Sequence, residues 1–131
     1  AEVARRHPGP VRLSELSETQ FIMLPRTVAP LYYDLVVTAC RRAGFTPRFS
    51  HEAGEWQTAL ALVAAGLGVM LVPESLRHWR RPGVAYAQFR PKSGSLTLEL
   101  VWRRDGPQPL VEAFVATART VAENTPAGSI A

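Results

Sequence analysis

Short apolar runs alternate with segments of helical periodicity along this chain, and that alternation restricts the possible fold more than any other feature. Residues 20–24 form an apolar run that Pro25 closes, which is typical of a strand buried on both faces. From Pro30 the apolar residues recur with helical spacing instead. They form one stripe of Leu31, Leu35, Ala39 and Ala43, widened by Tyr32, Val36 and Cys40. Gly44 ends that pattern in the manner of a helix C-terminus. The sequence therefore predicts a buried strand followed by a helix over residues 30–43.

The same order repeats further along the chain. Residues 48–53 have the composition of a second strand, and residues 56–65 form a helical segment that is apolar nearly all round. Residues 69–72 are a fully apolar run that Pro73 ends, and a short helix over residues 74–79 follows. Strands that alternate with helices in this way favour an α/β sheet flanked by helices.

The last third of the chain continues with shorter elements. Residues 84–89 form another β-rich run, and residues 96–103 alternate apolar with polar side chains, the period of a strand with one buried face. A final helix is predicted over residues 108–123, and residues 125–131 are expected to be a disordered tail. The apolar stripe of that helix comprises Leu110, Phe114, Ala118 and Val121.

Composition narrows the class of protein. The net charge is +4, but the arginines occur as scattered pairs with no basic strip of the kind that binds nucleic acid, so a solvated surface is the favoured interpretation. No run approaches the ~18 apolar residues that span a membrane. The single cysteine, Cys40, has no partner for an internal disulfide, which suits a reducing cytoplasm. Its position in an apolar helical segment predicts a small buried side chain without redox chemistry.

The sequence contains few patterns that are typical of catalytic or metal-binding sites. His7, His51 and His78 lie in three separate segments without metal-ligand spacing, and no nucleophile elbow or phosphate-binding loop occurs. We therefore predict no catalytic residue, no metal and no cofactor, and hence a protein that is not an enzyme. An acid/base pair of His51 and Glu55 is the weak alternative.

Two strand-to-helix junctions carry the best binding chemistry. Pro25, Arg26 and Thr27 follow the first predicted strand, and residues 53–58 follow the second. If both strands are parallel, the junctions open at the same edge of the sheet, where α/β proteins bind ligands. A guanidinium beside a helix start suits a carboxylate or another small anion. The competing interpretation, favoured by composition alone, is that Thr27 and Thr58 cap their helices and Arg26 is solvated.

The motifs FIMLPR, AGEWQT and VAAGLGV followed by LVP, in that order, resemble the effector-binding region of LysR-type transcriptional regulators. The resemblance implies two α/β lobes with a small-molecule effector in the cleft between them, a type 2 periplasmic-binding-protein-like fold. Within it, residues 1–88 would be the second lobe, with a mixed sheet flanked by helices. Residues 89–124 would supply the closing strand and helix of the first lobe. The resemblance also implies which residues face the cleft: Pro25, Arg26, Thr27, Ala53, Gly54 and Thr58, with Arg26 as the anion contact.

The resemblance further implies partners and raises a packing problem. By the resemblance, this chain would be a truncated form without the family's N-terminal winged helix-turn-helix, through which the family contacts DNA, and without the opening elements of the first lobe. The apolar faces of residues 96–102 and of the final helix would thereby lose their cover. We expect these elements to pack back on the remaining lobe or to associate with another copy, giving a homo-oligomer.

Two function classes follow. The first is the effector-sensing domain of a cytoplasmic transcriptional regulator that binds a small carboxylated metabolite. The second is a fragment of a periplasmic-type solute-binding protein for transport, which shares the two-lobe architecture. The free thiol of Cys40 leans against the second class.

Overall fold

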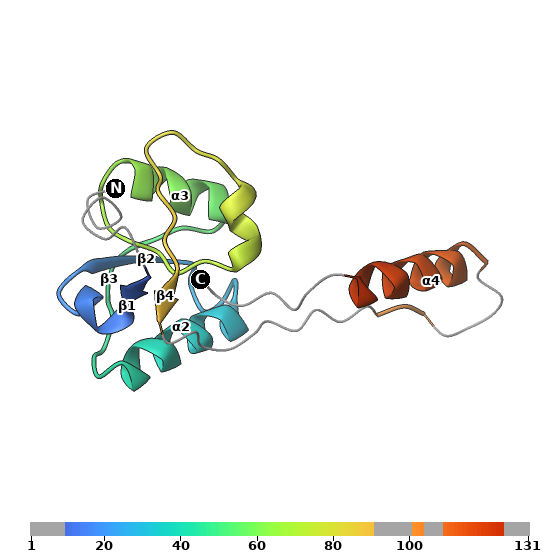
Figure 1. Cartoon of the computed structure of the whole chain (residues 1–131), viewed down its shortest axis with the longest axis horizontal. Coiled ribbons are helices and arrows are strands. Elements are labelled where there is room, and N and C mark those ends of the chain that lie inside the picture. The colour runs from blue at the N-terminus through green and yellow to red at the C-terminus, as the bar shows by residue number, and fades with distance from the viewer. Residues whose placement is uncertain (1–9, 91–100, 104–108, 125–131) are drawn as a thin grey trace.

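The computed structural model describes residues 10–90, 101–103 and 109–124 of the chain. Figure 1 shows residues 10–90 gathered in one body, with the last helix standing away from it. The alternation of strands and helices that the sequence predicts is confirmed from residue 20 to residue 78. The elements, in order, are β1 (Val11–Arg12), η1 (Leu13–Leu16), β2 (Gln20–Met23), α2 (Pro30–Arg42), β3 (Arg48–Glu52), α3 (Trp56–Ala64), η2 (Glu74–His78), β4 (Phe89–Arg90) and α4 (Pro109–Glu123).

β2 lies at the centre of the small sheet in the body. It pairs in parallel with β3, with a register shift between Phe21 and Ile22. On its other side the Ile22 N–H donates to the carbonyl oxygen of Val69 at 2.8 Å, and the Val69 N–H donates to that of Gln20 at 2.9 Å. The strand expected at residues 69–72 is therefore present only as a parallel bridge at Val69. The pairings of β1 with β4, of β2 with β3 and of Phe21 with Val69 are all parallel.

Gly68 allows residue 69 to approach β2 this closely. A Cβ atom added at Gly68 would lie 2.6 Å from the carbonyl oxygen of Gln20. Real side chains do not tolerate such a contact with a backbone atom. Glycine is therefore the residue that lets this third segment join the sheet.

The helices α2 and α3 lie on opposite sides of the sheet (Figure 1). α2 ends as predicted at Gly44, which has a φ of 91°. There the N–H groups of Phe45 and Gly44 donate to the carbonyls of Cys40 and Arg41, the pattern of a Schellman motif. The buried face of α2 consists of Tyr32, Val36, Ala39 and Cys40.

That buried face differs from the predicted stripe at its start. Leu31 was expected to belong to the stripe but is 70% exposed. The stripe is instead centred one position later, on Tyr32 and Val36, because Tyr32 reaches into the core between α3 and the segment ending at residue 72. The prediction for Leu31 is therefore wrong.

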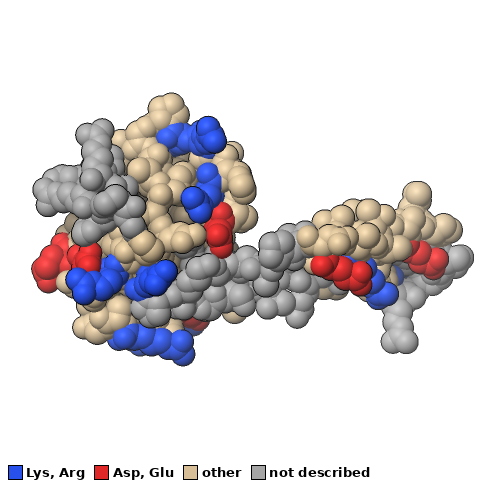
Figure 2. All heavy atoms as spheres, viewed as in Figure 1, with Lys and Arg blue, Asp and Glu red and all other residues tan. Residues whose placement is uncertain are grey.

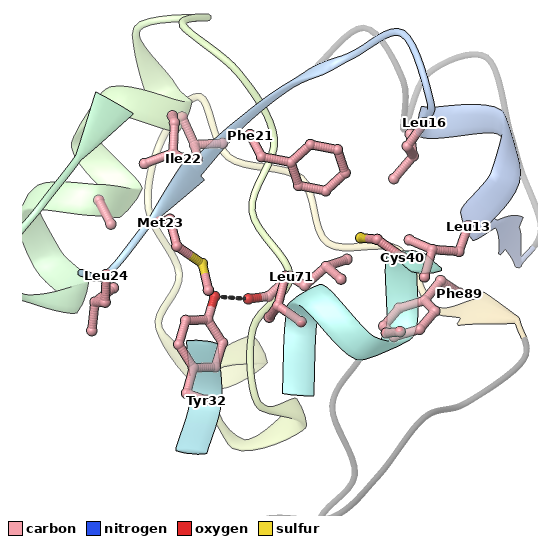
Figure 3. Close-up of a cluster of buried hydrophobic side chains, with 14 of the residues drawn as sticks. Leu13, Leu16, Phe21, Ile22, Met23, Leu24, Tyr32, Cys40, Leu71 and Phe89 are labelled. Atoms are coloured by element: carbon pink, nitrogen blue, oxygen red, sulfur yellow. Dashed lines mark hydrogen bonds between the residues drawn. The ribbon is translucent and has the colours of Figure 1, made fainter. Parts of the chain in front are cut away.

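A single apolar core fills the body (Figure 3). Its most enclosed members include Phe21, Met23 and Cys40, and no polar or charged side chain is buried among the described residues. Burial raises the pKa of the Cys40 thiol to about 11, which keeps it protonated and unreactive at neutral pH. The prediction that Cys40 is a small buried side chain is confirmed.

The two shortest strands bring distant parts of the chain together. β1 and β4 pair in parallel, with Val11 opposite Phe89. The run predicted over residues 84–89 is paired only at its end, since β4 covers Phe89–Arg90. Phe89 is buried in the same core as Leu13 and Val11.

α4 is confirmed as a helix, but it lies away from the body in Figure 1. The strand expected at residues 96–103 falls largely outside the described residues, as do His7 and the tail at residues 125–131. Residues 101–103 are irregular and exposed, and Val101 and Trp102 share a hollow with α4. Packing of α4 back on the body, one of two expected outcomes, is therefore not what the structure shows.

No helix in the described ranges combines the length and the apolar character needed to cross a membrane.

Candidate functional site

The two junctions proposed as a binding site do open at the same edge of the sheet. β2 and β3 are parallel, so the segments that follow them leave side by side. The Ala53 N–H donates to the carbonyl oxygen of Met23 at 3.0 Å, which ties the second junction directly to the end of β2. The expectation that parallel strands would make the junctions converge is confirmed.

The first junction is a tight turn between β2 and α2. The carbonyl oxygen of Pro25 accepts hydrogen bonds from the N–H groups of Val28 at 2.9 Å and Ala29 at 3.1 Å. Arg26 and Thr27 therefore project from the tip of this turn and are exposed to solvent. This is the position that a residue contacting a ligand in the cleft would need.

Arg26 is not a solitary cation. Its Nε and Nη2 atoms donate to the two carboxylate oxygens of Asp34 at 2.9 and 3.0 Å. The hydrogen bonds to Asp34 raise the pKa of Arg26, and those from Arg26 lower the pKa of Asp34. Both side chains are largely exposed, so this bidentate pair is easily opened. A bound anion would have to share the guanidinium with Asp34 or replace it.

The second junction is formed by Ala53, Gly54 and Glu55. Ala53 is buried and Gly54 is exposed, with no atom within 4 Å of the position that a Cβ on Gly54 would take. The Thr58 hydroxyl donates to Oε1 of Glu55 at 3.0 Å. A carboxylate therefore stands at this junction, so the positive charge at the shared edge comes from Arg26.

The capping interpretation of the two threonines is wrong. The residues that precede α2 and α3 are Ala29 and Glu55, and neither makes a side-chain capping bond. Thr27 lies before the cap of α2, and the Thr58 hydroxyl donates to Glu55 within α3's first turn. Neither hydroxyl therefore caps its helix as the N-cap residue.

A third junction, which the sequence interpretation did not include, meets the other two. Residues 69–72 run parallel to β2 and end at the same edge, where Pro73 leads into η2. The Tyr32 hydroxyl donates to the carbonyl oxygen of Leu71, as Figure 3 shows. The Tyr32 ring also packs edge-on against Trp56, with ring centroids 4.8 Å apart. Two features of the sequence pointed to this junction: the predicted strand at 69–72 and the apolar position of Tyr32. They can be connected only once the order of the strands in the sheet is known.

A further pocket, the histidine proposed as a catalytic alternative and the surface charges do not add to this site. An apolar pocket lies between α3, residues 68–72 and residues 84–89, and its lining includes none of the six predicted contacts. His51 Nδ1 lies 3.0 Å from the Ser50 hydroxyl rather than against Glu55. Within the described residues, no group of three or more His, Cys, Asp or Glu side chains could hold a metal ion. Figure 2 shows basic side chains in separate groups on the visible face of the body, with acidic side chains among them.

Comparison with known proteins shows the family to which this chain is similar. The model of the LysR substrate binding domain matches residues 2–123. The HTH-type transcriptional regulator IlvR of Caulobacter vibrioides is 39% identical over 82% of this chain and 36% of its own length. TfdS of Cupriavidus pinatubonensis is 33% identical over 91% of this chain and 40% of its own length. CatR of Pseudomonas putida is 32% identical over 94% of this chain and 44% of its own length.

These relatives are all HTH-type transcriptional regulators, and this chain spans about two fifths of their length. The periplasmic-binding-protein-like fold of the matched family agrees with the α/β body described above.

Proposed function

We propose that this chain, which belongs to the LysR substrate-binding-domain family, is the effector-sensing part of a cytoplasmic transcriptional regulator. The relatives named above are HTH-type transcriptional regulators. In this proposal DNA is contacted by a separate winged helix-turn-helix, and the regulator acts as a homo-oligomer. The chain itself supplies the second lobe and part of the first.

The effector that fits this lobe is a small organic anion. The observation that carries the proposal is the exposed Arg26 guanidinium, which stands at the edge where parallel β2 and β3 both end. Pro25, Thr27, Ala53, Gly54 and Thr58 would line the cleft beside it. A carboxylate of the effector would take the place of Asp34 on the guanidinium, an exchange between two similar bidentate pairs.

Binding would become a signal through a change in lobe arrangement. An effector that holds both lobes favours the closed arrangement by the difference between its affinities for the two arrangements. The body described here offers one wall of such a cleft. We therefore expect weak binding to this chain by itself, since a small ligand normally has most of its surface buried.

The test is an NMR titration of the ¹⁵N-labelled chain with acetate and, separately, with acetamide. Acetate is expected to shift the amide signals of Arg26, Thr27 and Gly54 with a dissociation constant of about 1–10 mM, and acetamide much less. The variant Arg26→Gln should lose the preference for acetate. Arg12→Gln is the matched control, because Arg12 also forms an exposed ion pair, with Glu15, but lies on β1. Equal acetate responses in all three proteins would refute the proposal.

A further inference from the structure

The connections that follow β2 and residues 69–72 leave the sheet toward opposite sides. β2 leads into α2 on one face (Figure 1). Residues 69–72 lead into η2, and the segment after η2 packs by α3 on the other face, where Trp79 and Leu60 line one hollow. In open α/β sheets, a crevice forms where neighbouring strands send their connections in opposite directions. Here that position lies between β2 and residues 69–72, not between β2 and β3.

Tyr32 stands at this position and links its two sides. It belongs to α2, which follows β2, yet its hydroxyl donates to the Leu71 carbonyl at the end of the neighbouring segment. The side chain is only 3% exposed. Its ring contacts Trp56 at the start of α3, so one side chain links α2, α3 and the end of residues 69–72.

β2 makes many backbone hydrogen bonds to β3 but few to residues 69–72, and this makes the Tyr32 side chain important. β2 and β3 are held together by a ladder of four residue pairs and by the bond from Ala53 to Met23. β2 and residues 69–72 are joined only around Val69. Beyond Val69, the described contact that ties the end of this segment to α2 is the Tyr32 hydroxyl.

We propose that this lobe's wall of the effector cleft extends across the ends of β2 and residues 69–72, and that Tyr32 is the positioning residue that sets the distance between the first and third junctions. Arg26 and Thr27 stand on one side of this position, and residues 73–75 stand on the other. This inference rests on the proposed function and adds a third junction to the site. Tyr32 acts through the Leu71 carbonyl and does not itself touch the ligand.

The experiment compares Tyr32→Phe with Tyr86→Phe. Both variants remove a hydroxyl that donates to a backbone carbonyl, since the Tyr86 hydroxyl donates to Trp79 at 2.9 Å, but Trp79 follows the end of η2 that is farther along the chain from the third junction. In the wild-type chain, acetate should shift the amides of Glu74 and Ser75 together with those of Arg26 and Thr27. Tyr32→Phe should weaken acetate binding about five-fold and abolish the response at Glu74 and Ser75, whereas Tyr86→Phe should preserve both.

Amide hydrogen exchange without any ligand provides the second readout. In Tyr32→Phe, the bridging amides of Ile22 and Val69 should exchange about ten-fold faster, while the Ala53 amide on the β3 side keeps its rate. Loss of global stability alone would accelerate all three amides together. Unchanged exchange at Ile22 and Val69, or acceleration of Ala53 to the same extent, overturns the positioning role. If the wild-type chain binds no acetate but exchange changes as expected, the proposed function fails and the positioning role stands.

Discussion

α2 and α4 carry similar apolar stripes but have opposite surroundings. α2 buries Tyr32, Val36, Ala39 and Cys40 against the sheet, whereas α4 buries Val115 alone. Of the 20 buried apolar residues in the described ranges, 19 belong to residues 10–90. The large side chains of α4 that remain exposed are Leu110 at 86%, Phe114 at 62% and Val121 at 59%.

The difference between α2 and α4 shows what a helical sequence pattern can predict and what it cannot. Periodicity tells which face of a helix is suited to burial, but it does not tell which element will cover that face. For α2 the cover is β2, its neighbour in sequence and in the sheet. For α4 the described cover is residues 101–103, which leave most of its apolar face in water. Four variants or conditions can break or sharpen this contrast.

The largest effect is expected from truncating a phenylalanine in each region. Phe21 is 1% exposed and packs near Phe45, with ring centroids 6.0 Å apart. Phe21→Ala should lower the free energy of unfolding by about 3–5 kcal/mol. Phe114→Ala should lower it by less than about 1 kcal/mol, because the side chain is already mostly in water. Urea unfolding followed by circular dichroism measures both, and similar losses would contradict the contrast between the regions.

A glycine pair inside the body gives the next largest effect. Gly68→Ala should destabilise the body by about 1–3 kcal/mol, because its methyl group meets the Gln20 carbonyl and displaces the Val69 bridge. Gly54→Ala is the matched control. It has open space at the Cβ position and should change the unfolding free energy by about 0.5 kcal/mol or less. Equal effects would show that residues 69–72 do not depend on the close approach.

Alkaline pH should weaken the body through Cys40. Its folded-state pKa is raised by burial from 9.0 to about 11, so between these values only the unfolded chain releases the thiol proton. The stabilisation is therefore complete below pH 9 and is lost as pH rises to about 11, by about 2 kcal/mol. Cys40→Ala should remove this part of the pH dependence in urea unfolding at pH 8, 9, 10 and 11. Burial also raises the pKa of Tyr32, so a smaller slope above pH 10 should remain in Cys40→Ala. A slope as steep in Cys40→Ala as in the wild type would show that Cys40 does not contribute.

The smallest effect concerns association through α4. If its exposed face packs on a second copy, the mean mass in light scattering should rise with concentration. Leu110→Glu should then weaken association about ten-fold. Ala116→Glu adds the same charge to an exposed position on the other side of α4 and should leave the mass profile unchanged. A wild-type chain that stays monomeric at every concentration would exclude this way of covering α4.

Much of the body could be predicted because its signals are local. Pro30 and Gly44 fix the ends of α2 through the restricted backbone angles of proline and glycine. Leu31 was placed wrongly because the centre of a buried stripe depends on what packs against it, here Trp56 and the Leu71 carbonyl. Residues 84–87 have β-rich composition but no ladder partner among the described residues, and composition does not determine which segments pair.

The sequence was sufficient to predict the two junctions of the candidate site. It was not sufficient to predict the Arg26–Asp34 ion pair or the third junction. Strand-then-helix order was sufficient to bring residues 25–27 and 53–54 to one edge. The pairing of Arg26 with Asp34 spans a turn and the first turn of α2, so helical spacing rules do not reveal it. The third junction needs the strand order, which depends on the contact between Phe21 and Val69.

The parallel pairing of β1 with β4 has a mechanical consequence. The chain enters the body at residue 10, next to Val11, and leaves it at residue 90, next to Phe89. Because the two strands run in the same direction, tension applied between residue 10 and residue 90 pulls them past each other. Their hydrogen bonds are then loaded together in shear, instead of being opened one at a time. Forces from elements attached at these two points would therefore slide β1 against β4 and act directly on Val11 and Phe89 in the core.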